Sequence, residues 1–151
     1  MEYPKTRKML LGSFQNSIDA KNRCIIPAKL RDELGFKCVM SKGLDGCIIL
    51  YPLQTWEAQK KQLMELPYSD EAARKYRRFI VANAMEADID KQGRILIPQQ
   101  WKEFAKISKD LVTVGNLDYV EIWAQEVFDS SEAGAKLGPE DFKDFSKSYQ
   151  I

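Results

Sequence analysis

The sequence predicts an α+β fold in which two similar units form one small β-barrel with pseudo-twofold symmetry, flanked by helices. A nine-residue phrase occurs twice, at residues 19–27 and 90–98, with Asp, Arg, Ile and Pro in matching places. The hydrophobic pattern after each copy repeats the same order of strand, helix and hairpin. About four short strands per unit cannot enclose a core alone, so we expect the fused units to close one barrel without free edges.

Length and composition are those of one globular domain. The chain has 151 residues, of which 44% are hydrophobic and 30% are charged, and its net charge is +1. This balance excludes a strong attraction of the whole molecule to nucleic acid, so any such attraction must come from local clusters of charge.

The reactive residue types exclude several kinds of active site. The chain has no histidine, which removes Ser-His-Asp and Cys-His nucleophiles and most zinc sites. Cys24, Cys38 and Cys47 lack the C-x-x-C spacing of a metal site, and we expect them to be buried thiols. Cys38 and Cys47 could face each other across a hairpin, but a reducing cytosol would normally keep them as thiols. We expect no metal, no cofactor and no catalysis.

The ends of the chain carry little signal. No run of residues is long and apolar enough for a transmembrane helix, and the first residues lack the apolar segment of a signal peptide. We therefore expect a cytoplasmic protein. Lys5, Arg7 and Lys8 could touch phosphates, but a solvated terminus is the preferred interpretation.

The first unit, residues 10–60, is built around the first copy of the phrase. Asp19 predicts a turn because its carboxylate can hydrogen-bond the backbone two residues on, and Asn22 tolerates a positive φ. Pro27 can begin a helix because its missing N–H has no partner there. The expected elements are a strand over 11–18, a strand over 23–26, a helix over 28–34 and a hairpin of 36–41 with 46–51.

A linking helical region, residues 61–83, connects the two units, and with the end of the first unit it forms a helical hairpin. Leu53, Trp56 and Leu63 recur at helical spacing and predict its first helix. Asp70 can cap the second helix, which should end near residue 81. That helix carries a basic cluster that we interpret as a solvated face rather than a second anion site: Arg74, Lys75, Arg77 and Arg78.

The second unit, residues 84–130, repeats the plan of the first. Gly93 stands where the first copy has Asn22, as a left-handed turn position would allow. The expected elements are a strand over 85–89, a strand over 94–97, a helix after Pro98 and a hairpin of 111–115 with 119–123. Residues 131–151 form a polar tail, which either packs loosely or forms a short helix around Phe142 and Phe145.

Each turn leads into an arginine, and this placement points to DNA. A guanidinium can pair with phosphate oxygens or take guanine O6 and N7 together. Lysines in and after the turns would bind phosphate as point charges. The candidate DNA-binding residues are Arg23, Arg94, Lys21, Lys91, Lys29 and Arg31. The candidate turn-shaping residues are Asp19, Asn22, Asp90 and Gly93. The alternative is that Asp and Arg merely pair across a tight turn.

At these residues the sequence resembles the MraZ family, within the SpoVT/AbrB-like superfamily of transcription factors. The family signature is a duplicated Asp-x-x-Gly-Arg turn followed by apolar residues and Pro; here it reads Asp-Ala-Lys-Asn-Arg and Asp-Lys-Gln-Gly-Arg. The resemblance covers about residues 10–130. Further matches are Gly-Leu-Asp-Gly-Cys at 43–47, Leu-Tyr-Pro at 50–52 with Trp56, Val-Gly at 114–115 and Glu-Ile-Trp at 121–123. Asn22 departs from the usual Gly, and we expect a slightly altered turn.

The resemblance implies a DNA-binding transcription regulator. Such a protein would bind short direct repeats in the promoter ahead of the division and cell-wall gene cluster, and would be cytoplasmic and nucleoid-associated. The implied partners are double-stranded DNA and further copies of the chain in a ring-shaped homo-oligomer, with no membrane and no small-molecule substrate. The implied fold resembles the swapped-hairpin AbrB barrel, made from two halves of one chain.

Two other functions are compatible with this class of barrel. An antitoxin-type module would use it to grip a partner protein, but such proteins usually have one barrel half per chain, and this chain has both. A purely structural ring protein would retain no specific DNA.

Overall fold

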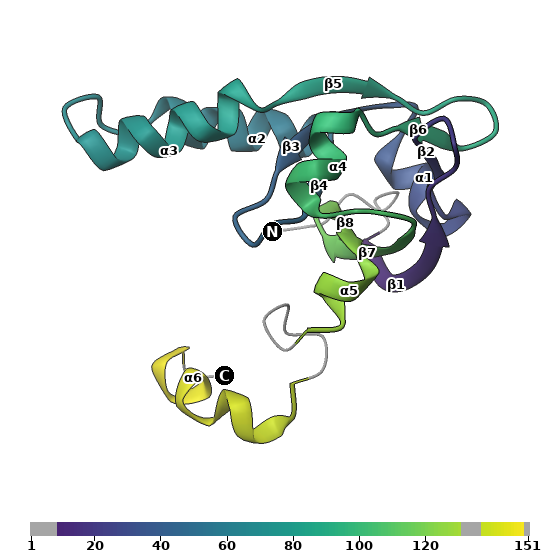
Figure 1. The fold of residues 1–151 in the computed structure, drawn as a ribbon. Helices are drawn as coiled ribbons and strands as arrows, with labels where there is room; N and C mark the ends of the chain where they lie inside the picture. The colour runs from purple at the N-terminus through teal and green to yellow at the C-terminus, as the bar shows by residue number, and fades with distance from the viewer. Residues whose placement is uncertain (1–8, 131–136, 150–151) are drawn as a thin grey trace.

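A computed structural model describes residues 9–130 and 137–149 of the chain. The fold is α+β, as predicted, with a larger and a smaller antiparallel sheet and several helices (Figure 1). The basic residues Lys5, Arg7 and Lys8 lie outside the described residues, and so does part of the tail. Among the described residues, no helix is both long and apolar enough to cross a membrane.

The larger sheet has six strands, and every neighbouring pair is antiparallel. Its strands are β1 (Leu10–Ser17), β3 (Lys37–Lys42), β4 (Ile48–Pro52), β5 (Met85–Asp88), β7 (Asp110–Leu117) and β8 (Tyr119–Ala124). They lie in the order β1-β7-β8-β4-β3-β5. The smaller sheet, here called the β2–β6 ribbon, pairs β2 (Arg23–Ile25) with β6 (Arg94–Leu96). The predicted strands and hairpins are therefore confirmed, with ends shifted by one or two residues.

The helices begin where the prolines and the capping residue predict. Pro27 and Pro98 are the N-caps of α1 (Ala28–Leu34) and α4 (Gln99–Ala105). The Asp70 carboxylate caps α3 by accepting a hydrogen bond from the backbone N–H of Ala72 at 3.3 Å. The remaining helices are α2 (Leu53–Met64), α3 (Glu71–Ala82), α5 (Gln125–Phe128), the 3₁₀ turn η2 (Pro139–Phe142) and α6 (Lys143–Tyr149). The last two confirm the short C-terminal helix.

The strand order reads the same from both edges once the two repeats are matched. β1 pairs with β7 in one half of the sheet, and the corresponding strands β5 and β3 pair in the other half. At the centre β4 pairs with β8, and Ile49 faces Glu121, its own counterpart in the second repeat. The two repeats are thus related by an approximate twofold, and each contributes strands to both halves of the sheet.

The closed barrel that the sequence predicts is not confirmed. Hydrogen bonding among the described residues gives a six-stranded sheet with β1 and β5 at its edges, and a separate ribbon. One isolated bridge, between Ile89 and Ile95, connects the chain after β5 to the ribbon. The core lies between these elements and includes fully buried residues from both repeats: Leu10, Ile26, Leu30, Leu34, Met40, Ile48, Leu50, Ile95, Ile97, Leu111, Val120 and Ile122.

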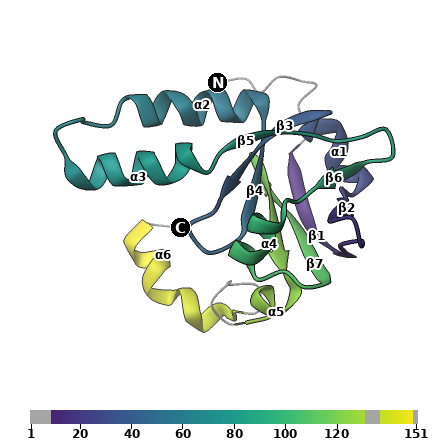
Figure 2. The same cartoon turned by 45° about the horizontal axis from the view of Figure 1, so that its top comes forward.

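The three cysteines are buried free thiols, as expected. Cys38 faces Pro52 across the β3–β4 hairpin, whereas Cys47 precedes β4 near the hairpin loop. The alternative in which Cys38 faces Cys47 is therefore wrong. The turns that precede β2 and β6 lie at one end of the molecule, and the α2–α3 hairpin extends from the other end in both views (Figures 1 and 2).

Candidate nucleic-acid interface

The first turn (residues 19–23) is held by the Asp19 carboxylate. Its Oδ1 accepts hydrogen bonds from the backbone N–H groups of Lys21 and Arg23, both at 2.9 Å. Its Oδ2 accepts a hydrogen bond from Nε of Arg23 at 3.1 Å. The backbone N–H of Asn22 donates to the carbonyl of Asp19 at 3.0 Å. One carboxylate therefore sets both the backbone of the turn and the direction of the arginine.

The second turn (residues 90–94) has the same hydrogen bonds. Oδ1 of Asp90 accepts from the backbone N–H groups of Gln92 and Arg94 at 2.9 and 2.8 Å. Its Oδ2 accepts from Nε of Arg94 at 2.8 Å. The backbone N–H of Gly93 donates to the carbonyl of Asp90 at 2.9 Å. The sequence repeat is therefore also a repeat of geometry.

Both turns need a residue in the left-handed region. Asn22 has φ 62° and Gly93 has φ 81°. Asn is among the few residues with a side chain that adopt this conformation readily, so the turn tolerates the replacement of the usual Gly.

The environment of each aspartate favours its ionised form. The pKa of Asp19 is lowered, chiefly because the carboxylate accepts the backbone N–H of Arg23. The pKa of Asp90 is lowered for the same reason by the backbone N–H of Arg94. The hydrogen bonds from both arginine side chains act in the same direction. The turns are thus arranged around charged carboxylates.

The β2–β6 ribbon places the two arginines on one face. Arg23 faces Leu96 and Arg94 faces Ile25, while Cys24 faces Ile95 at the centre. Residues that face each other, or that lie two apart on a strand, share a face of the sheet. Cys24 and Ile95 are 2% and 1% exposed and point into the core. The opposite face of the ribbon, which we call the outer face, therefore carries both arginines, each facing an apolar residue across the ribbon.

The apolar residues of the outer face are exposed. Ile25 is 48% exposed and Leu96 is 56% exposed. Neither residue was predicted to belong to the site, because each lies in an apolar run that is typical of a buried strand. The strict alternation of faces in a two-stranded ribbon is the signal that would have separated them from Cys24 and Ile95.

Each arginine pairs with the aspartate of its own turn, as the alternative interpretation expected. The pair uses only Nε among the described residues, and the side chains of Arg23 and Arg94 remain 29% and 30% exposed. A guanidinium has two further nitrogens that can donate hydrogen bonds. Pairing through Nε therefore orients the group and still leaves donors for a second acceptor.

The predicted lysines lie where an anion could reach them. Lys21 and Lys91 are exposed in the two turns, and Lys29 is exposed on α1. By contrast, the basic cluster lies on α3, in the hairpin at the other end of the molecule (Figure 1). Within it, Lys75 pairs with Glu71 at 3.2 Å, in keeping with a solvated helix face.

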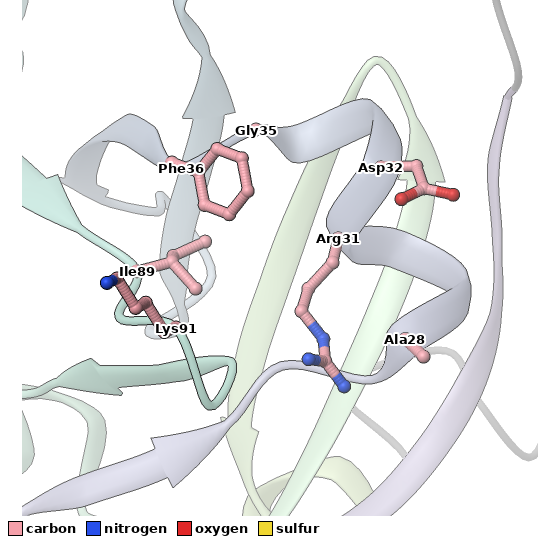
Figure 3. Close-up of a pocket in the computed structure, with 7 residues that line it drawn as sticks. All are labelled: Ala28, Arg31, Asp32, Gly35, Phe36, Ile89 and Lys91. Atoms are coloured by element: carbon pink, nitrogen blue, oxygen red, sulfur yellow. The ribbon is translucent and has the colours of Figure 1, made fainter.

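Arg31 differs from the three predicted lysines, which are exposed. It lies half-buried on α1 and lines a cavity of about 410 Å³ beside the second turn. Figure 3 shows Arg31 leaving α1 on one side of this cavity, with Ile89 and Lys91 on the other. Its guanidinium lies directly against Gly93, so the first repeat contributes a side chain to the turn of the second.

Lys102 on α4 makes the corresponding contact in the other direction and was not predicted. Its Nζ donates a hydrogen bond to Oδ1 of Asn22 at 3.0 Å. The available signal was the repeat itself, since Lys102 occupies in the second repeat the position that Arg31 occupies in the first. Over residues 9–130 and 137–149 there is no cluster of three or more His, Cys, Asp or Glu that could hold a metal ion.

Comparison with known proteins shows which family the sequence matches. A family model described as "MraZ protein, putative antitoxin-like" matches residues 9–79 and again residues 80–142. A protein of Clostridium beijerinckii named transcriptional regulator MraZ is 51% identical over 118 residues, which are 78% of this chain and 83% of that protein. Proteins of the same name from Caldanaerobacter subterraneus and a Thermoanaerobacter species are 42% and 50% identical. The first match covers 95% of this chain and 100% of the relative, and the second covers 80% and 85%.

Proposed function

This chain belongs to the MraZ family, and we propose that it is a transcription regulator that binds double-stranded DNA through the outer face of the β2–β6 ribbon. Its relatives are named transcriptional regulators, which implies a regulatory role rather than a catalytic one. We propose that it acts in the cytoplasm, at the nucleoid.

The observation that carries this proposal is the shared face of Arg23 and Arg94. They come from opposite repeats and are oriented by equivalent aspartates. A two-stranded ribbon is narrow enough to enter the major groove, where an arginine can donate two hydrogen bonds to guanine O6 and N7. The two arginines would therefore read the bases, and Asp19 and Asp90 would orient them rather than touch the anionic duplex.

The surrounding residues would position the duplex. Lys21 and Lys91 extend from the two turns, and Lys29 lies on the helix after the first ribbon strand, so all three would meet phosphates beside the groove. Ile25 and Leu96 would contact thymine methyl groups or sugars, because they are the apolar residues of the outer face. Arg31 is treated separately below.

We further propose that the targets are short direct repeats in a promoter, ahead of the division and cell-wall gene cluster, and that several chains bind together as a ring. The net charge of +1 supports this, because one chain offers few phosphate contacts. Copies held in one assembly gain affinity through their effective concentration on spaced repeats.

We also infer that the two sheets together form the small barrel of swapped hairpins. The Ile89–Ile95 bridge connects the β5 edge to the ribbon, and β1 approaches β2 at the other edge. The ribbon thus lies between the two edges of the larger sheet, where closure would occur.

A gel-shift series tests the proposed function. The purified chain is titrated against a promoter duplex that carries the direct repeats, first selected by the chain from genomic fragments, and against a shuffled duplex, with oligomer size measured in parallel. Arg23→Ala and Arg94→Ala should each weaken binding by about tenfold or more, as expected for a lost bidentate base contact. Arg77→Ala, an exposed base on α3, is the control and should leave affinity unchanged.

Equal affinity of the wild-type chain for both duplexes would contradict sequence-specific binding. Unchanged affinity of both arginine variants would rule out the ribbon as the binding face. Failure to retain DNA, together with capture of one co-encoded protein, would favour the antitoxin-type module.

A further inference from the structure

Each turn of the candidate interface is contacted by a helix of the opposite repeat. On one side, Nζ of Lys102 on α4 donates a hydrogen bond to Oδ1 of Asn22 at 3.0 Å. On the other, the guanidinium of Arg31 on α1 covers Gly93 so closely that a Cβ there would collide with its Nη1. Both contacts fall on the left-handed residue of the turn, directly before the arginine.

The two contacts join matching positions of the two repeats, but they use different side chains. Arg31 and Lys102 occupy matching positions of the two repeats, and so do Asn22 and Gly93. In the second turn a bare glycine leaves room for a flat guanidinium to pack on the backbone. In the first turn the side chain of Asn22 fills that room. The ammonium group of Lys102, a compact donor, donates a hydrogen bond to the side-chain amide oxygen of Asn22.

The state of Arg31 agrees with a packing role. Its Nε is buried and has no hydrogen-bond partner among the described residues. Nη1, Cζ and Nε of Arg31 all lie next to Gly93, so the guanidinium contacts this turn by van der Waals packing rather than by a hydrogen bond from Nε.

We propose that Lys102 and Arg31 are positioning residues, and that Asn22–Lys102 and Gly93–Arg31 are matched pairs that each fix one turn from the opposite repeat. The proposal deepens the proposed function, on which it rests, because these turns orient Arg23 and Arg94. Each arginine then depends on its own repeat for the ribbon strand and on the other repeat for the angle of the turn.

Amide hydrogen exchange, measured by NMR without DNA, tests the positioning directly. Lys102→Ala should speed exchange at the backbone amides of Lys21 and Arg23 by about two- to tenfold, as expected for the loss of one hydrogen bond. The matching amides of Gln92 and Arg94 should keep their rates. Equal acceleration in both turns, or none in either, would overturn the proposal.

An exchange of partners tests the matching. Gly93→Asn alone should clash with Arg31 and speed exchange throughout the second turn. Adding Arg31→Lys reproduces at the second turn the Asn–Lys pair of the first turn. It should restore the exchange rates of the second-turn amides to within about twofold of the wild-type rates. If Gly93→Asn does not fold, recovery of the folded protein in the double variant is the same test. A double variant no better than Gly93→Asn would rule out matched pairs.

DNA affinity then separates this proposal from the one it rests on. Lys102→Ala should weaken binding, and the loss should not add to that of Arg23→Ala, because both act through the first turn. It should add fully to the loss of Arg94→Ala. Altered exchange with unchanged affinity in every arginine variant would end the proposed function and leave the positioning intact. Weaker binding by Arg23→Ala, with unaltered exchange in Lys102→Ala, would end the positioning alone.

Discussion

Arg23 and Arg94 are diagonal neighbours across the β2–β6 ribbon, because Arg23 faces Leu96 and Arg94 faces Ile25. The approximate twofold axis passes between Cys24 and Ile95, so the two arginines occupy equivalent positions about it. If DNA binds along this face, it would meet two guanidinium groups related by an approximate twofold axis. The two antiparallel strands of a DNA duplex are related by the same kind of axis.

The lysines of the turns should determine how strongly binding depends on salt. If Lys21 and Lys91 bind phosphates as proposed, Lys21→Ala and Lys91→Ala would each remove one such contact, so the slope of log affinity against log salt should decrease by about one for each. Binding should weaken about equally for specific and shuffled duplexes. A gel-shift series over several salt concentrations measures this slope. An unchanged slope in both variants would show that the turns do not meet the phosphate backbone.

The turns should loosen at acid pH. The pKa values of Asp19 and Asp90 are lowered below the ordinary value of 3.8, chiefly by the arginine backbone N–H groups. A lowered pKa in the folded state contributes stability that is present above 3.8 and is lost as pH falls through the lowered value. Carboxyl ¹³C titration should show both groups titrating below 3.8. Values at or above this ordinary value would mean that the turn hydrogen bonds are absent in solution.

The last residue of β6, Leu96, and the residue that follows it, Ile97, should differ sharply in their effect on stability. Ile97 is fully buried, whereas Leu96 is 56% exposed. Ile97→Ala should lower the free energy of unfolding by about 2–5 kcal/mol, because it leaves a cavity. Leu96→Ala should change it by about 0.5 kcal/mol or less. Urea denaturation of the two variants measures both values, and a similar loss in each would contradict the assignment of faces.

The Cys24 thiol should report on the integrity of the ribbon. Burial raises its pKa to about 12, and the side chain lies behind the outer face. Because the thiolate is the reactive form, a thiol reagent at mildly alkaline pH should label Cys24 slowly in the folded protein and rapidly in urea. Labelling followed by mass spectrometry of the peptides gives the rate for each cysteine. Rapid labelling of Cys24 without denaturant would mean that the ribbon opens readily.

Much of this fold could be predicted from sequence because its determinants are local. Pro27 and Pro98 mark the starts of α1 and α4, and Asp19 and Asp90 specify the turns through hydrogen bonds that span four residues or fewer. The repeat strengthened each of these predictions, because the same order of strands and helix had to fit the sequence of both repeats.

The contacts between repeats could not be predicted in the same way. Hydrophobic spacing predicts that α4 exists, but it does not say that Lys102 reaches a turn in the other repeat. Ile25 also belongs to an apolar run, and its exposure depends on which face of β2 the rest of the fold covers. The roles of the arginines and lysines toward DNA stay predictions, because the duplex itself is needed to test them.

The palindromic strand order has a consequence for the nascent chain. Leu10 at the start of β1 pairs with Leu117 at the end of β7, so the first strand of the first repeat needs a strand of the second. At a synthesis rate of about 5–20 residues per second, β1 waits for several seconds before its partner emerges from the ribosome. During that interval only the β3–β4 hairpin and the early helices can form in the first half. Until the second repeat is complete, the emerging chain therefore exposes an unpaired strand edge with which a second nascent chain could pair.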